Sequence, residues 1–244
     1  MRNKNYIKVY NRLVKYPMFP VTPVKKTAHK VKKGTAVMQS ETEVTVYDEE
    51  KIYAILYLVQ TKQAEITFKE ITDTTTAVVI ETSLYQIAKL IKNNNYANII
   101  DSLVRVSNLT LVYDVEKKAD GKIIKGKAIF HPIYKIEVLE NKKIKIIMDS
   151  KFYNACISKH FFINVEYFAL AGHAKNIYKF LATNLTQKTI SLTTISERCL
   201  FSKFQKKEQR RILKEALKKI QKTTLAKNYN FKLEKDILHI IPKK

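Results

Sequence analysis

Residues 202–220 read SKFQKKEQRRILKEALKKI, and their pattern gives the clearest indication of the fold. Ser202 and Gln205 fit the S-x-x-Q capping box, which predicts a helix that begins there and runs to about Thr223. The apolar residues recur at helical spacing and predict one buried face, formed by Ile212, Leu213, Ala216, Leu217 and Ile220.

The opposite face of this helix is basic. At about 100° per residue, the outward positions carry two acids, Glu208 and Glu215, and are otherwise dominated by Lys206, Lys207, Arg210, Arg211, Lys214 and Lys218. Such a helix fits the major groove of DNA. Guanidinium and amide groups can form paired bonds to base edges, so the candidates for base contacts are Arg210, Arg211 and Gln205, and the lysines are candidates for phosphate contacts. The alternative is an ordinary solvated face.

The elements around this helix have the order of a winged helix. The pattern predicts, in order, a helix over 169–185, a short strand at 189–190, a helix capped by Ser191, the basic helix, and a hairpin of strands 231–233 and 237–241. On the hairpin, Lys232 and Lys235 are expected to reach the DNA backbone. Residues 151–244 are therefore predicted to be a C-terminal winged-helix DNA-binding domain.

Residues 35–150 repeat this order of elements. The predictions are a helix over 45–62, a strand over 75–82, a helix capped by Ser83, and a helix over 96–106. Strands follow at 109–115, 122–130, 134–139 and 144–148. The third helix is expected to bury Ile99, Ile100, Leu103 and Val104 and to point outward Asn95, Asn98, Asp101, Ser102 and Arg105. The sequence thus predicts an α+β fold of two tandem winged-helix domains, each with a helical core and a β-hairpin wing.

The hairpin of the first domain carries its own basic cluster. Around the turn Ala119-Asp120-Gly121 lie Lys117, Lys118, Lys122, Lys125 and Lys127. This cluster is either a wing that grips phosphates or an ordinary solvated hairpin. The helices of this domain are less basic, which leaves them free for self-association.

The first 34 residues contain ten Lys or Arg residues and no acid, with prolines at Pro17, Pro20 and Pro23. No sustained helical period occurs there. We interpret the segment 1–34 as a basic N-terminal arm, with a disordered tail as the alternative. An apolar, aromatic connector is expected over 152–168.

The composition indicates an anionic partner. The chain has 244 residues, with 45 Lys and Arg against 22 Asp and Glu, and its formal charge of +23 repels itself unless an anion is bound. It contains no run of 18 apolar residues and no signal-peptide core, so we expect a soluble protein of the cytoplasm. Cys156 and Cys199 lack the spacing of a disulfide framework or a zinc site.

The sequence contains none of the common catalytic motifs. It lacks G-x-x-x-x-G-K-[ST] and G-x-G-x-x-G, and its five histidines include no H-x-H or H-x-x-x-H pair. Cys199 lies on an apolar helix face, where burial makes a thiol a poor nucleophile. We therefore expect no enzymatic activity, no metal and no cofactor.

Three segments of the second half carry a family pattern: 168–181, FALAGHAKNIYKFL; 190–195, ISLTTI; and 204–220, within the stretch quoted first. They resemble the C-terminal winged helix of plasmid replication initiators of the iteron-binding Rep type, over residues 165 to 241. In that family an A-K-x-[IL]-Y-x-[FL]-L helix precedes one ending in L-x-x-A-[LI]-x-x-[IL]. The resemblance implies two winged-helix domains, binding to repeated origin sites (iterons), no catalysis, a repressing dimer in equilibrium with an initiating monomer, and host replication proteins as partners.

These observations favour a sequence-specific protein that binds double-stranded DNA, most simply a plasmid replication initiator. A winged-helix transcriptional repressor is the alternative within the same class. The alternative from another class is a structural protein that binds nucleic acid nonspecifically through the basic arm. Neither half shows aromatic-bearing strands of the kind that stack bases in single-strand readers, which counts against RNA.

Overall fold

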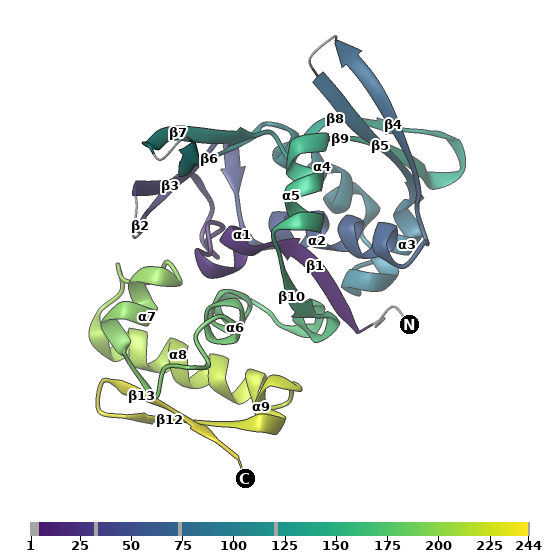
Figure 1. Ribbon diagram of the computed structural model, residues 1–244. Coiled ribbons are helices and arrows are strands. Elements are labelled where there is room, and N and C mark those ends of the chain that lie inside the picture. Colours follow the sequence, from purple (N-terminus) through teal and green to yellow (C-terminus); the bar gives the residue numbers. More distant parts are fainter. Residues whose placement is uncertain (1–4, 32–33, 73–74, 120–121, 244) are drawn as a thin grey trace.

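The computed structural model describes residues 5–31, 34–72, 75–119 and 122–243. Within these ranges the helices pack against antiparallel sheets, and the predicted α+β class is confirmed. Figure 1 shows a larger half that holds most of the strands and a smaller half that ends in the yellow hairpin. Among the described residues, no helix is long and apolar enough to cross a membrane.

The second half has the predicted order of a winged helix. Its helices are α6 (His173–Ala182), α7 (Leu192–Arg198), α8 (Lys206–Ile220) and a short α9 (Leu225–Asn228), which the sequence did not predict. Its sheet has the order β11-β13-β12, with β11 (Thr189–Ser191), β12 (Tyr229–Glu234) and β13 (Ile237–Pro242). The apolar face of α8 packs against α6, and the buried residues include Leu213, Leu217 and Ile220.

The start of α8 differs from the prediction. The helix begins at Lys206 with Gln205 as its N-cap, and no side chain caps it, so the predicted capping box is wrong. The Gln209 side chain supports the preceding turn instead, because its Nε2 donates to the carbonyl oxygens of Ser202 (3.0 Å) and Phe204 (2.6 Å).

The helices predicted for the first half are present, but its strands form two sheets. The helices are α2 (Val46–Gln60), α3 (Leu84–Ile91) and α4 (Tyr96–Ser107). One sheet has the order β2-β3-β6-β7, with β2 (Val24–Val31), β3 (Gly34–Val44), β6 (Leu109–Ala119) and β7 (Lys122–Phe130). The other has the order β4-β5-β9-β8, with β4 (Glu65–Thr72), β5 (Thr75–Ser83), β8 (Ile133–Val138) and β9 (Lys143–Asp149). A 3₁₀ turn, Glu140–Lys142, joins β8 to β9. The strand before α3 therefore does not pair with the hairpin β6–β7, which departs from a simple winged helix.

The rotation of α4 about its axis also differs from the prediction. Val104, expected in the core, is 47% exposed, whereas Ser102, expected outside, is 1% exposed. The cause is Asp48 at the start of α2: its Oδ1 accepts bonds from Ser102 Oγ (2.6 Å) and from Arg105 Nη2 (2.8 Å). A buried carboxylate needs such partners, and this need outweighs the burial of one valine.

The prediction of an N-terminal arm or tail is wrong. Residues from this segment form β1 (Tyr6–Tyr10), which pairs with β10 (His160–Asn164), followed by α1 (Asn11–Lys15) and β2. The apolar residues between the lysines enter the core, and six of them have no exposed surface: Ile7, Val9, Leu13, Val14, Met18 and Phe19. The expected connector is likewise structured, as α5 (Ser150–Ser158), β10 and the 3₁₀ helix Val165–Ala169.

The two halves are joined by buried ion pairs between α2 and α6. Lys179 Nζ donates to Glu49 Oε2, and Lys175 Nζ donates to Glu50 Oε1 at 2.7 Å. Lys179 and Glu49 are both 0% exposed. Burial raises the pKa of Glu50 and lowers the pKa of Lys175 and Lys179, and in each group burial outweighs the opposing partner charge. Each of these groups therefore depends on its partner to stay charged in the core.

We predict that Lys179→Met destabilises the protein by about 3 to 5 kcal/mol, because it leaves Glu49 buried without a counter-charge. Adding Glu49→Gln should recover at least about half of this loss, since the amide oxygen still accepts the bond that Tyr53 Oη donates at 2.8 Å. Unfolding in urea measures both values. The exposed Lys207→Met is the control and should change stability by less than about 0.5 kcal/mol. A loss below about 1 kcal/mol for Lys179→Met would show that the pair does not hold the halves together.

Candidate nucleic-acid interface

The outward face of α8 carries three lysines that are available to a ligand. Lys207, Lys214 and Lys218 are exposed, and their spacings of about two turns and one turn keep them on the side opposite the core. Among the described residues, no carboxylate lies within ion-pair distance of these three ammonium groups. Their placement agrees with the outward face predicted from the sequence, and their contact with DNA stays a prediction.

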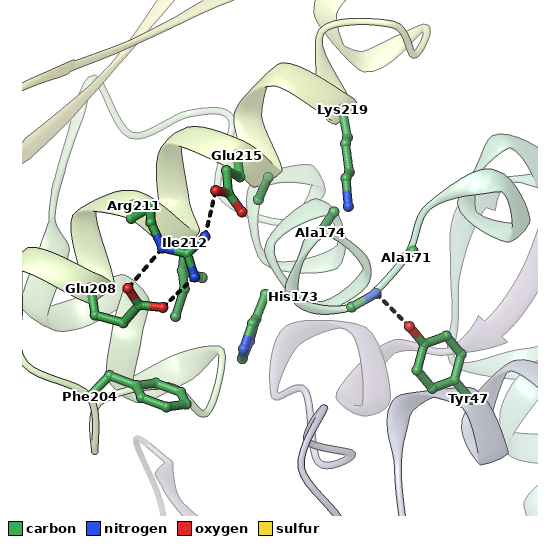
Figure 2. A pocket seen from close by; sticks show the side chains of 12 residues that line it. Tyr47, Ala171, His173, Ala174, Phe204, Glu208, Arg211, Ile212, Glu215 and Lys219 are labelled. Atoms are coloured by element: carbon green, nitrogen blue, oxygen red, sulfur yellow. Dashed lines mark hydrogen bonds and ion pairs between the residues drawn. The ribbon is translucent and has the colours of Figure 1, made fainter.

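Arg211 lies on one flank of this face, between two carboxylates (Figure 2). Its Nε and Nη2 donate to Glu208 at 2.8 and 2.5 Å, and its Nη1 donates to Glu215 at 2.6 Å. These bonds raise the pKa of Arg211 and lower the pKa of Glu208. The Arg211 side chain is nevertheless 58% exposed, so water can compete for each of these bonds. Arg211 can therefore exchange its partners for another acceptor.

Arg210 connects α8 to the hairpin. Its Nε and Nη2 donate to the two carboxylate oxygens of Asp236 at 2.7 and 3.0 Å. The backbone oxygen of Asp236 also accepts a bond from Leu192 N at 2.7 Å, which connects the hairpin turn to α7. This paired geometry fixes the position of the hairpin relative to α8. Arg210, predicted as a base reader, is thus engaged in holding the wing.

Of the remaining predicted residues of the second half, Lys206 Nζ lies 3.8 Å from Asp236 Oδ2, beside Arg210, and three others lie at the edges of the same surface. Gln205 is exposed at the N-terminus of α8. Lys235 is exposed at the hairpin turn, with a left-handed φ of 52°. Lys232 is exposed but pairs with Glu234 at 2.5 Å. The helix start and the wing tip therefore flank the basic face of α8.

The lysine cluster of the first half lies on a hairpin, as predicted. In the β6–β7 ladder, Lys117 pairs with Ile124, Lys118 with Ile123, and Lys122 with Ala119, while the turn at Asp120-Gly121 lies outside the described residues. Lys125 is exposed. β2 forms the opposite edge of the same sheet and carries the exposed Lys25 and Lys26 of the former arm.

The sequence did not indicate a depression of about 330 Å³ where α8 meets the start of α6. Tyr47 of the first half lines it, and its Oη accepts a bond from Gly172 N at 2.9 Å (Figure 2). His173 Nδ1 is buried and lacks a hydrogen-bond partner among the described residues, and burial lowers the pKa of His173. The carboxylates and cations that line the depression balance one another in charge, so the depression favours neither an anionic nor a cationic ligand. Only the packing of the two halves could reveal it.

Comparison with solved structures identifies proteins of the same fold. The crystal structure of selenomethionine derivatives of domains 2 and 3 of RctB matches with a TM-score of 0.64 at 10% identity, over 95% of this chain and 98% of that one. A second crystal structure of RctB domains 2–3 matches with a TM-score of 0.61 at 11% identity, over 96% and 97%. No family model matches the sequence, and no curated protein does. Nearly the whole chain is thus similar in fold to a two-domain segment of RctB.

Proposed function

We propose that this protein is a replication initiator of the cytoplasm that binds double-stranded DNA at specific sites, and that these sites are the repeated sequences (iterons) of a plasmid origin. The main support for DNA binding is the exposed basic face of α8, which belongs to a three-helix unit with a β-hairpin. The fold likeness to RctB supports the choice of initiator, because RctB is a replication initiator. The charge of +23 supports an anionic partner.

In this proposal α8 enters the major groove. Lys207, Lys214 and Lys218 neutralise phosphates, and Lys235 at the wing tip meets the backbone beside the groove. Arg211 exchanges its bonds to Glu208 and Glu215 for a base edge, since a guanidinium can bond guanine at two atoms. Gln205 at the start of the helix is the second candidate for a base edge. Arg210 acts indirectly by holding the hairpin through Asp236.

The first half contributes phosphate contacts and self-association. The lysines of the β6–β7 hairpin and of β2 lie on one sheet and supply the contacts. The edge strand β4 exposes Ile66 (41%) and Phe68 (54%), and such an edge suits pairing with a second copy, which supports a homodimer in equilibrium with a monomer. Host replication proteins are further partners in this proposal.

We also propose that the protein acts by binding alone. Purified protein is expected neither to hydrolyse ATP nor to nick supercoiled plasmid, since the sequence carries no motif for either reaction. Phosphate release and gel mobility of the plasmid measure the two activities. Metal-dependent nicking that persists through purification and disappears in a point variant would contradict this part of the proposal.

We predict that replacing Lys207, Lys214 and Lys218 together with glutamine weakens binding to any duplex. Each phosphate contact adds about 0.9 to the slope of log affinity against log salt, so the slope should become flatter by roughly 2 to 3. Titration of a labelled random-sequence duplex at several salt concentrations measures it. The control variant replaces the exposed Lys62, Lys89 and Lys92 of the first half and removes the same charge. An equal change in both variants would mean that total charge, rather than α8, determines binding.

We predict that Arg211→Ala weakens binding to the preferred duplex by roughly ten-fold or more, the usual effect of losing one paired base contact. Binding to random duplex should change much less, and thermal melting should be unaffected because the side chain is exposed. Arg211→Lys is the control, since it keeps the charge but loses the paired donors of the guanidinium. On the preferred site it should behave like Arg211→Ala. Normal binding by Arg211→Ala would limit Arg211 to its bonds with Glu208 and Glu215.

A further inference from the structure

The small sheet of β1 and β10 has an aromatic outer face. Its two strands come from opposite ends of the larger half, and Figure 1 shows them side by side next to the start of the smaller half. Lys8 pairs with Phe162 across the sheet, and Tyr6 and His160 lie on the same face. Phe162 is 53% exposed and Tyr6 is 38% exposed. The inner face, with Ile7, Val9 and Ile163, is buried in the core.

The ring of Phe162 has two aromatic neighbours. The His160 ring lies 4.7 Å away at 78°, and the Tyr6 ring lies 6.3 Å away at 79°, both in edge-to-face geometry. Within the described part of the chain, no ring stacks in parallel on Phe162. Lys8 Nζ lies 6.0 Å from the centre of its ring. The site thus combines a fixed, exposed ring with an adjacent cation.

The chain around this ring is basic. Residues 5–16 and 159–164 contain Lys8, Arg12, Lys15 and Lys159 and no acid. The first acid after β10, Glu166, is engaged by Thr224, whose backbone N and Oγ1 donate to it at 2.7 and 2.9 Å. A ligand on this face is therefore expected to carry negative charge and a flat ring.

We propose that the outer face of β1 and β10 binds single-stranded nucleic acid. An unpaired base stacks on Phe162, and Lys8 and Lys159 meet the phosphates on either side of it. Paired bases in a duplex are already stacked on one another, so this face does not compete with α8 for duplex DNA. Local sequence could not indicate this aromatic face, because the sheet that carries it forms only when two distant segments pair.

The chain has no tryptophan, which makes a direct test of stacking available. Phe162→Trp places one indole at the site, and titration of the full chain with oligo(dT) of 12 nucleotides should quench its fluorescence in a saturable manner. A parallel titration with oligo(rU) distinguishes DNA from RNA as the source of the base. Tyr85→Trp is the control, since Tyr85 is 58% exposed on α3, and its fluorescence should not respond. An equal response at both positions, or none at Phe162, overturns the proposal.

Affinity gives the second readout. Phe162→Ala and Phe162→Leu should both weaken oligo(dT) binding by roughly ten-fold or more, because leucine keeps the apolar bulk but not the flat ring. Phe162→Trp should bind at least as well as the wild type, and Tyr85→Ala should bind normally. Wild-type affinity for oligo(dT) in Phe162→Leu means that stacking is not the interaction and contradicts the proposal.

The two nucleic-acid sites are separable in one experiment. Phe162→Ala should bind duplex normally, and the α8 variant with glutamine at 207, 214 and 218 should retain the quenching of the indole by oligo(dT) when combined with Phe162→Trp. Excess duplex should leave bound oligo(dT) in place. Displacement of oligo(dT) by duplex at a one-to-one ratio would assign both ligands to one site and overturn this inference while leaving the function of α8 intact.

Discussion

Two lysines of α6 lie buried against two glutamates of α2, and the arrangement of the halves depends on these pairs. Apolar surfaces can pack in several registers, but Lys179 without Glu49, or Lys175 without Glu50, would leave a charge in the core. Burial raises the pKa of Glu50 and lowers the pKa of Lys179, so each of these charges depends on its partner, and the pairs favour one geometry of the two halves. The amide of Asn176 adds to this, because its Nδ2 donates to Phe19 O at 2.7 Å and fixes the folded N-terminal segment against the same helix.

The contact between α2 and α6 also determines where the proposed binding surface lies. The apolar face of α8 packs on α6, which leaves Lys207, Lys214 and Lys218 in solvent on the far side. Arg210 then binds Asp236 in the hairpin turn, which connects the wing directly to the helix. In the larger half, β1 and β10 cover part of the core with one face and expose Phe162 on the other. Both proposed nucleic-acid surfaces thus have fixed positions relative to α6.

Features that depend on neighbouring residues could be predicted from the sequence, and features that depend on distant pairing could not. The helices α2, α3 and α8 and the hairpin β12–β13 follow from local spacing. The rotation of α4 could not be predicted, because Ser102 and Arg105 turn toward Asp48, which precedes them by more than four dozen residues. The lysines of the N-terminal segment suggested a basic arm. The signal for the strand β1 was the alternation of its apolar residues, Ile7 and Val9. The pairing of Arg211 with Glu208 and Glu215 did have a signal, since these residues are spaced at i, i+3 and i, i+4.

The central claim is that α8 reads a duplex sequence. Selection of bound duplexes from a pool of random sequence, with the full chain and then with Arg211→Ala, tests it most directly. The wild type is expected to enrich one defined motif, with binding typically about 10³-fold or more above random duplex. Arg211→Ala is expected to relax the preference at one or two adjacent positions of that motif. A pool that stays random after repeated rounds, or a motif that is unchanged in Arg211→Ala, would contradict it.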